Sequence, residues 1–321
     1  MHDPILAHTW AHVFLTQLRS LGVERVCVAP GSRSTVLAIQ AARVFSAATT
    51  VHFDERGLAF FALGVAKTTR VPTCIITTSG TAVANLLPAI VEAHQARVPL
   101  IVISADRPPE LRDRGSNQTI DQNRIFGEYV SWYFDLPCAS EEIPLDVVRD
   151  WAIQAWDRSG GDRPVHINWM FREPFLPADG DVEGVSSNIA VEAGACRRVS
   201  ITPDLSPLLG RIEGSRRGVC VIGELESQAE AELARSFVSS LGWVTFADPL
   251  SNLRCDDRLS TLIAYGDLAL LERLPEDRQP DTVLFLGGRV VSKRIASLLR
   301  ASAATRVISI SSYPLNINPC Y

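Results

Sequence analysis

The sequence predicts an α/β protein in which an open parallel sheet forms the first domain and a smaller α/β unit follows. Short apolar runs alternate with helical patterns along the chain, an order typical of parallel strands joined by right-handed crossovers. These runs are apolar throughout, as expected for strands that helices cover on both faces. A length of 321 residues leaves room for two domains.

The first domain opens with a helix, because Trp10, Phe14, Leu18 and Leu21 recur at helical spacing. The elements expected next are a strand over 23–29, a helix over 35–45, a strand over 50–53, a helix over 58–67, a strand over 71–77, a helix over 79–93 and a strand over 98–104. A polar, arginine-rich stretch over 111–126 predicts a loop with a short helix. A strand over 129–136, a helix over 145–156 and a strand over 165–171 complete the domain.

The stretch from Arg172 to Gly214 is rich in Pro, Gly, Asp and Ser and has weak periodicity, which predicts a linker with room for parts of it to pack on a domain surface. We therefore expect a first domain over 1–175, a linker over 176–214 and a second domain over 215–321. The elements expected in the second domain are strands over 219–222, 243–246, 283–286 and 307–310 and helices over 226–241 and 292–299.

Composition excludes several classes of protein. The net charge of -5 gives no support to nucleic-acid binding. The chain lacks an apolar run long enough to span a membrane and a basic-then-apolar start typical of a secretory signal, so a cytoplasmic protein is expected. The seven cysteines are scattered without a CxxC pair, which predicts reduced thiols and neither a zinc site nor a disulfide framework.

Four turns that follow predicted strands carry polar or special residues, and in a parallel sheet such turns share one edge. They are Gly31-Ser32-Arg33, Asp54-Glu55-Arg56, Ser79-Gly80-Thr81 and Asp106-Arg107. Glycines there let a ligand approach the backbone, and hydroxyls near helix N-termini lie beside N–H groups that favour anions. A serine or threonine at such a position can instead be only a helix cap. The arginines favour an anionic small molecule, although solvated surface arginine is the alternative.

Glu55 is the candidate for acid–base chemistry. It precedes an apolar helix, Leu58 to Leu63, which we expect to be buried, and a carboxylate beside such a helix would be desolvated. Desolvation favours the protonated form and suits proton exchange with a ligand nitrogen. The alternative is an exposed first-turn glutamate that stabilises the helix dipole. Neither a GxxxxGK[ST] nor a GxGxxG motif occurs, so nucleotide binding by those loops is not expected.

Several segments together resemble one family. They are APGSRST at 29–35, HFDERG at 52–57, TSGTAVAN at 78–85, SADRPPE at 104–110 and GSNQ at 115–118. These segments resemble the N-terminal part of the 2-succinyl-5-enolpyruvyl-6-hydroxy-3-cyclohexene-1-carboxylate synthases, thiamine-diphosphate enzymes of menaquinone biosynthesis. The segment over 287–294 resembles that family's middle domain. The resemblance implies a pyrimidine-binding first domain and a Rossmann-like, transhydrogenase-like middle domain.

The resemblance also implies an activity. Members of the family are transferases that decarboxylate 2-oxoglutarate on thiamine diphosphate and add the succinyl carbanion to isochorismate. Glu55 matches the glutamate that hydrogen-bonds the aminopyrimidine ring of the cofactor, and Gly80 and Thr81 match its neighbours at the cofactor. The positions that match the substrate pocket of the family are Ser32, Arg33, Arg107, Asn117, Gln118 and Lys293. The arginines and the lysine suit the carboxylates of both substrates.

The family's third domain holds the diphosphate through Mg²⁺ or Mn²⁺, with a Gly-Asp-Gly start and a later Asn pair. Gly161-Asp162, Gly180-Asp181 and Gly266-Asp267 do not continue into that pattern, so no metal ligand is expected in this sequence. We expect either a fragment or a chain whose diphosphate-binding domain comes from another polypeptide. Because the family's active site lies between subunits, a homodimer or homotetramer is also expected.

Two other functions remain open from the sequence. One is a catalytically silent remnant that binds a metabolite or a partner. The other is a thiamine-diphosphate decarboxylase of acetolactate-synthase type, which the Ser32-Arg33 and Asp106-Arg107-Pro108-Pro109 motifs disfavour.

Overall fold

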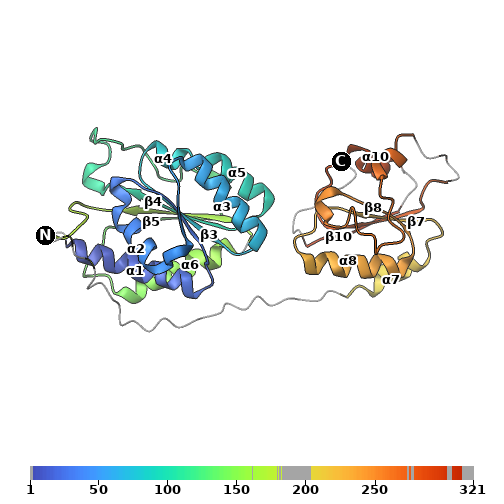
Figure 1. The fold of residues 1–321 in the computed structure, drawn as a ribbon, viewed down its shortest axis with the longest axis horizontal. Helices are drawn as coiled ribbons and strands as arrows, with labels where there is room; N and C mark the ends of the chain where they lie inside the picture. The colour runs from blue at the N-terminus through green and yellow to red at the C-terminus, as the bar shows by residue number, and fades with distance from the viewer. Residues whose placement is uncertain are drawn as a thin grey trace. The chain divides into compact units, whose positions relative to one another are not determined.

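The computed structural model describes residues 3–160, 162–178, 180, 182, 204–272, 275, 278–301 and 306–312. The chain divides into two compact units, Met1–Arg198 and Val199–Tyr321, and each contains one sheet (Figure 1). All strand pairs in both sheets are parallel, which confirms the predicted α/β class.

The first unit is built on a six-stranded sheet with the order β2-β1-β3-β4-β6-β5. Its strands are β1 (Val26–Ala29), β2 (Thr49–Val51), β3 (Thr73–Thr77), β4 (Leu100–Asp106), β5 (Trp132–Leu136) and β6 (Pro164–Met170). The four central strands are buried along their whole length, as the apolar runs predict, whereas β2 and β5 form the edges.

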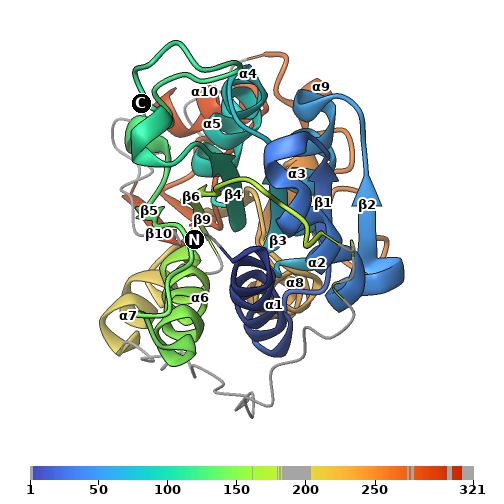
Figure 2. The same ribbon diagram turned by 90° about the vertical axis from the view of Figure 1, so that its left-hand side faces the viewer.

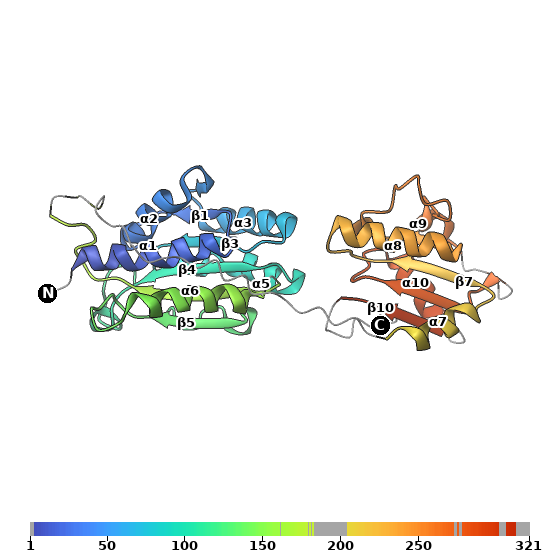
Figure 3. The same cartoon turned by 90° about the horizontal axis from the view of Figure 1, so that it is seen from below.

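Helices cover both faces of this sheet. One hydrophobic core lies under α1 (Pro4–Ser20), α2 (Thr35–Phe45) and α6 (Leu145–Ser159). A second core lies under α3 (Glu55–Thr69) and α5 (Leu87–Ala96), with the short helix α4 (Thr81–Ala84) before α5. Figures 2 and 3 show α1 and α6 running along the same side of the sheet. Short 3-10 turns occur at Ser32–Ser34, Ser46–Ala48, Pro109–Leu111, Gly127–Tyr129 and Pro249–Ser251.

The helix expected over 79–93 is interrupted. It forms α4 and α5, which are separated at Asn85 and Leu86. Pro88 lies in the first turn of α5, where its missing N–H costs nothing, whereas inside a continuous helix it would remove a hydrogen bond. The break places Asn85 at a bend, where its side chain can leave the helix surface.

The second unit has a four-stranded sheet of order β10-β9-β7-β8. Its strands are β7 (Gly218–Ile222), β8 (Val244–Ala247), β9 (Thr282–Leu286) and β10 (Arg306–Ile310), and its helices are α7 (Ser206–Glu213), α8 (Gln228–Leu241), α9 (Gly266–Ala269) and α10 (Lys293–Ala301). Residues of α7 and α8 pack on one face of the sheet and residues of α10 on the other (Figure 1).

Part of the predicted linker is ordered as helix α7. Its Ile212 is buried in the core of the second unit and Leu208 packs against the same core, with Pro207 in the first turn. This part of the stretch therefore packs on the second unit, as the linker expectation allowed. No helix within the described ranges is both long enough and apolar enough to cross a bilayer.

Candidate functional site

The four predicted turns follow the carboxyl ends of β1, β2, β3 and β4, and the parallel pairing of these strands places the turns along one edge of the sheet. The first turn lies against Thr78, the residue that precedes the third turn. A Cβ atom on Gly31 would lie 2.5 Å from Cβ of Thr78, so the first turn packs this closely only because residue 31 is glycine. The structure therefore brings together the backbone segments that the sequence singled out.

Glu55 is the first residue of α3. Asp54 caps the helix by accepting a hydrogen bond from the Gly57 amide at 2.5 Å, and His52 Nδ1 accepts one from the Asp54 amide at 3.1 Å. Across the turn, Asn85 Nδ2 donates to Glu55 Oε2 at 3.2 Å. Among the described residues, Asn85 is thus the one side chain that hydrogen-bonds to the Glu55 carboxylate, and it lies between α4 and α5.

The environment of Glu55 differs from the prediction. We expected burial by the apolar run that follows it, but Glu55 is half-buried. The run itself is divided by helical geometry, since Leu58 and Ala59 are buried whereas Phe60 and Phe61 are each 44% exposed. This chain alone does not desolvate the carboxylate as the sequence reasoning assumed.

Apolar side chains stay exposed around the same turn. Phe53, two residues before Glu55, is 97% exposed, and Val51 at the end of β2 is 61% exposed. Val51 and Phe53 are thus exposed apolar side chains close in sequence to Glu55.

Arg107 forms hydrogen bonds with several of the predicted site residues. Its buried guanidinium donates to Ser79 Oγ, to the Gln118 carbonyl at 2.8 Å and to the Asn117 carbonyl. Burial lowers the pKa of this guanidinium, and the positive charge of Arg33 lowers it further. All three hydrogen-bond acceptors are neutral oxygens, whereas the negative charges of Asp106 and Glu173 act on Arg107 from nearby and oppose the lowering of its pKa.

Arg33 is also buried and anchored in the protein. It donates to the Phe171 carbonyl at 2.9 Å and to Glu173 Oε1 at 3.0 Å, and it lies 4.8 Å from the ring centre of Phe175. Ser32 begins the 3-10 turn next to it and stays exposed. Arg33 thus joins the first turn to the segment that follows β6.

Sequence reasoning missed a buried polar network beneath these turns. Ser104 Oγ donates to Asn168 Oδ1 at 2.9 Å and lies 2.7 Å from His166 Nε2, so the histidine carries its proton on Nε2. Asn168 donates to Asp106 and Asp135. The available signal was polar residues at alternate positions inside apolar strand runs, which point to the same face.

Arg112 completes this network. It pairs with Asp106 Oδ2 at 2.7 Å and with Asp135 Oδ2 at 2.9 Å, and these carboxylates raise its pKa although burial opposes them. Arg112 lies in the arginine-rich stretch over 111–126, and here it neutralises two carboxylates of the protein. Burial lowers the pKa of His166 to about 3, so this ring is neutral.

Lys293 belongs to the second unit, where it is the first residue of α10 and is exposed. Buried Asp248 fixes the chain before it, because Oδ2 accepts from the Val291 amide at 2.7 Å and the Ser292 amide at 3.1 Å. Each unit is described separately, so the structure does not join Lys293 to the turns of the first unit.

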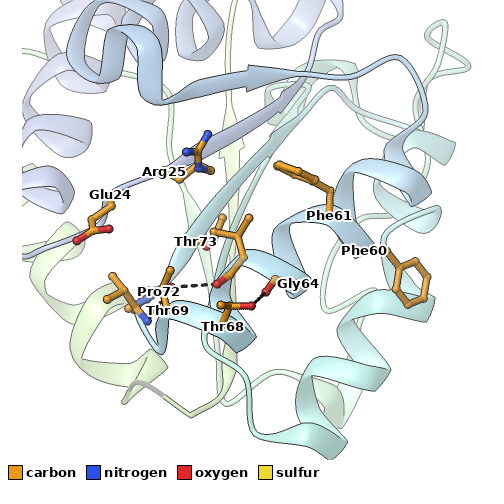
Figure 4. Close-up of a pocket in the computed structure, with 11 residues that line it drawn as sticks. Glu24, Arg25, Phe60, Phe61, Gly64, Thr68, Thr69, Pro72 and Thr73 are labelled. Carbon is orange, nitrogen blue, oxygen red and sulfur yellow. Dashed lines mark hydrogen bonds between the residues drawn. The ribbon is translucent and has the colours of Figure 1, made fainter. Parts of the chain in front are cut away.

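A pocket of about 750 Å³ lies elsewhere on the first unit. Figure 4 shows that its lining comes from α3, including Phe61 and Gly64, and from Arg25 and Thr73, at the amino ends of β1 and β3. The predicted site residues are at the opposite, carboxyl ends of these strands, and none of them lines this pocket. Within the described part of the chain, no group of three or more His, Cys, Asp or Glu side chains could hold a metal ion.

Comparison with protein families matches both units. Residues 8–125 match a thiamine pyrophosphate enzyme, N-terminal TPP binding domain, and residues 212–320 match a middle domain of thiamine pyrophosphate enzymes. Among solved structures, a thiamin diphosphate-dependent enzyme from Mycobacterium smegmatis has a TM-score of 0.66 at 19% identity, covering 95% of this chain and 57% of that one. Benzoylformate decarboxylase from Polynucleobacter necessarius has a TM-score of 0.63 at 18% identity, covering 98% and 56%. These two structures support the fold alone.

Closer relatives share one name. A 2-succinyl-5-enolpyruvyl-6-hydroxy-3-cyclohexene-1-carboxylate synthase from Salinibacter ruber is 40% identical, over 98% of this chain and 56% of its own length. One of the same name from Rubrobacter xylanophilus is 39% identical, over 97% and 55%. The chain spans about half the length of these relatives. The resemblance seen in the sequence motifs is thereby confirmed.

Proposed function

This chain belongs to the thiamine pyrophosphate enzymes, and on that basis we propose that it is the N-terminal and middle part of a 2-succinyl-5-enolpyruvyl-6-hydroxy-3-cyclohexene-1-carboxylate synthase. The reaction is the decarboxylation of 2-oxoglutarate and transfer of the remaining succinyl unit to isochorismate. The observation that carries the proposal is Glu55, held by Asn85 at the carboxyl edge of the sheet, in a chain that is 40% identical to a synthase of that name.

Residues of the first unit fit the aminopyrimidine half of thiamine diphosphate. Glu55 offers a half-buried carboxylate that can share a proton with a ring nitrogen. The turn at Gly80 and Thr81 starts α4, and Asn85 at the end of α4 donates to Glu55. When bound, the cofactor supplies the electron sink for decarboxylation. The role of Glu55 in this proposal is to hold the proton at the ring.

The other half of the cofactor needs ligands from elsewhere. Mg²⁺ or Mn²⁺ bound to the diphosphate requires hard oxygen ligands, which a diphosphate-binding domain would provide. The exposed Val51 and Phe53, at the end of β2 just before Glu55, support a homodimer in which a partner covers the Glu55 turn and completes its desolvation. A cytoplasmic location is part of the proposal and agrees with the buried free thiols, such as Cys27 and Cys74.

The substrate site is proposed to lie over the same turns. Ser32, Asn117 and Gln118 offer hydrogen bonds, and Lys293 would add a positive charge from the second unit. Arg107 contributes a buried charge that only neutral oxygens contact, which favours a substrate carboxylate nearby. Arg33 forms an ion pair with Glu173, so in the absence of substrate its proposed role is to hold the first turn in place.

The test is reconstitution. The purified chain is incubated with 2-oxoglutarate, isochorismate, thiamine diphosphate and Mg²⁺, with and without the separately expressed diphosphate-binding domain of a relative. We expect product only in the presence of that domain. Turnover by the chain alone would remove the need for it, and no turnover with a folded added domain would favour a silent binding module.

Glu55→Gln tests the assigned role within the same assay. The amide keeps the size of the side chain but cannot exchange the proton, so activity should fall about 10²- to 10⁴-fold. Glu92→Gln is the matched control, because Glu92 is an exposed carboxylate on α5. Full turnover by Glu55→Gln would remove Glu55 from catalysis.

A further inference from the structure

The peptide group between Ser79 and Gly80 is held from both sides. On one side, Gln118 Nε2 donates to the Ser79 carbonyl at 2.9 Å. On the other, the Gly80 amide donates to Gln122 Oε1 at 2.9 Å. Because the N–H and C=O of a trans peptide point in opposite directions, the two glutamines fix the plane of this one peptide.

The conformation at Gly80 requires such support. Its φ of +82° with ψ of -145° is a region that glycine alone enters readily, and a Cβ there would lie 2.9 Å from Cγ of Gln118. The Gly80 carbonyl accepts from the Val83 amide at 3.0 Å. Both backbone groups of Gly80 are therefore engaged inside the protein, and the turn presents Thr81 to its surroundings.

The side chain of Gln122 is held by further hydrogen bonds in the interior of the protein. Its side chain is fully buried, and Nε2 donates to Asn168 Oδ1 at 2.8 Å and to the Ala105 carbonyl at 3.2 Å. Two donors and one acceptor of the amide are thus used, which fixes its orientation. Asn168, which accepts from Gln122, in turn donates to the buried Asp106.

We propose that Gln122 is a positioning residue that fixes the Ser79–Gly80 peptide, and with it the start of α4, for binding of the cofactor's aminopyrimidine ring. The cofactor role rests on the function proposed above, whereas the fixed peptide is a property of the fold. Gly80 then allows the close packing of Gln118 and contributes no hydrogen bond to the ligand, since both of its backbone groups are used within the protein. Asn85, one turn along, reaches Glu55 from the element that this peptide starts.

The first test measures the Gly80 amide. In protein labelled with ¹⁵N-glycine, hydrogen exchange of Gly80 is followed by NMR in wild type, Gln122→Met and Gln40→Met. Methionine fills a similar volume but accepts no such hydrogen bond, so Gly80 should exchange about tenfold faster in Gln122→Met. Gln40 is an equally buried glutamine bonded to His8 and His12, and its replacement should leave Gly80 unchanged.

Unchanged exchange of Gly80 in a folded Gln122→Met would overturn the proposal. Should that variant not fold, Gln122→Asn tests the same contact, because its amide is one methylene shorter and no longer reaches the Gly80 amide. Faster exchange at Gly80, with glycines elsewhere unchanged, supports the contact. Wild-type protection of Gly80 in a folded Gln122→Asn would count against it.

The second test uses the reconstituted enzyme. Gln122→Met should raise the thiamine diphosphate concentration for half-maximal rate about tenfold and leave the KM for 2-oxoglutarate unchanged. A merely structural role would lower the amount of active protein and move neither constant, as expected for Gln40→Met, and that result would refute positioning. Should no enzyme be reconstituted with wild type, the proposed function fails, while the exchange measurement still decides the contact.

Discussion

His166 should make the stability of the first unit depend on pH between about 7 and 5. Its ring is fully buried in β6, with Nε2 at Ser104 and with Nδ1 lacking a hydrogen-bond partner among the described residues. Phe126 packs against it with ring centres 4.7 Å apart, and Tyr133 lies 5.3 Å away. A proton on Nδ1 would place an unsolvated charge against these rings.

The size of the effect follows from the two pKa values. Burial lowers the pKa of His166 from 6.5 to about 3, although the charge of Asp135 opposes this shift. The unfolded chain then binds the extra proton below pH 6.5 and the folded chain does not, so stability is complete above pH 6.5 and falls as pH decreases. Linkage gives a loss of about 2 kcal/mol between pH 7 and pH 5.

Urea unfolding followed by tryptophan fluorescence measures this loss, since five of the six tryptophans lie in the first unit. His166→Gln can still donate to Ser104 but does not titrate, so its stability should change about 2 kcal/mol less over the same range. Other titrating groups, including His8 and His12, are common to both proteins and cancel in the comparison. Equal pH dependence in wild type and variant would refute a neutral, buried His166.

Three further changes have defined outcomes. Arg112→Met leaves two carboxylates beneath the turns without their cation and should destabilise the first unit by about 3 kcal/mol in urea unfolding; a loss below about 1 kcal/mol would contradict the network. Asp248→Ala removes the acceptor for two amides before α10 and should cost about 2 kcal/mol, with faster exchange of those amides; unchanged exchange would argue against the contact. Gly31→Ala forces a Cβ against Thr78 and should lower the thermal midpoint, equivalent to about 2 kcal/mol, whereas an unchanged midpoint would mean that the turns move apart freely.

The sheet of the first unit was predictable because its central strands are continuous apolar runs in the sequence. An apolar run such as Leu100 to Ser104 has no stable place except between two layers of helices, and the structure buries all of β4. Helix α7 was not predicted as a helix, because it is short and lies in a Pro- and Gly-rich stretch with weak periodicity. Its packing in the core of the second unit depends on residues of β7 and α8, which lie beyond it in the sequence.

The candidate site was predictable in position but not in environment. Glu55 lies at the start of its helix as expected, yet it is only half-buried, and Phe53 two residues before it is exposed, which no local sequence pattern reveals. Gln122 and Asn168 are separated by 46 residues and meet only through the strand order of the sheet. Their contact could not be inferred from sequence spacing. The roles of Ser32, Arg33 and the other substrate residues stay predictions.

The scarcity of lysine gives this protein a chemical handle. Lys67 and Lys293 are the only lysines in the sequence; Lys67 is exposed on α3, and Lys293 is exposed at the head of α10. A reagent selective for lysine amines therefore labels one defined position in each unit. Lys67 can serve as an internal standard, so that any protection of Lys293 by an added carboxylate compound is read as a ratio of two peptides within one sample.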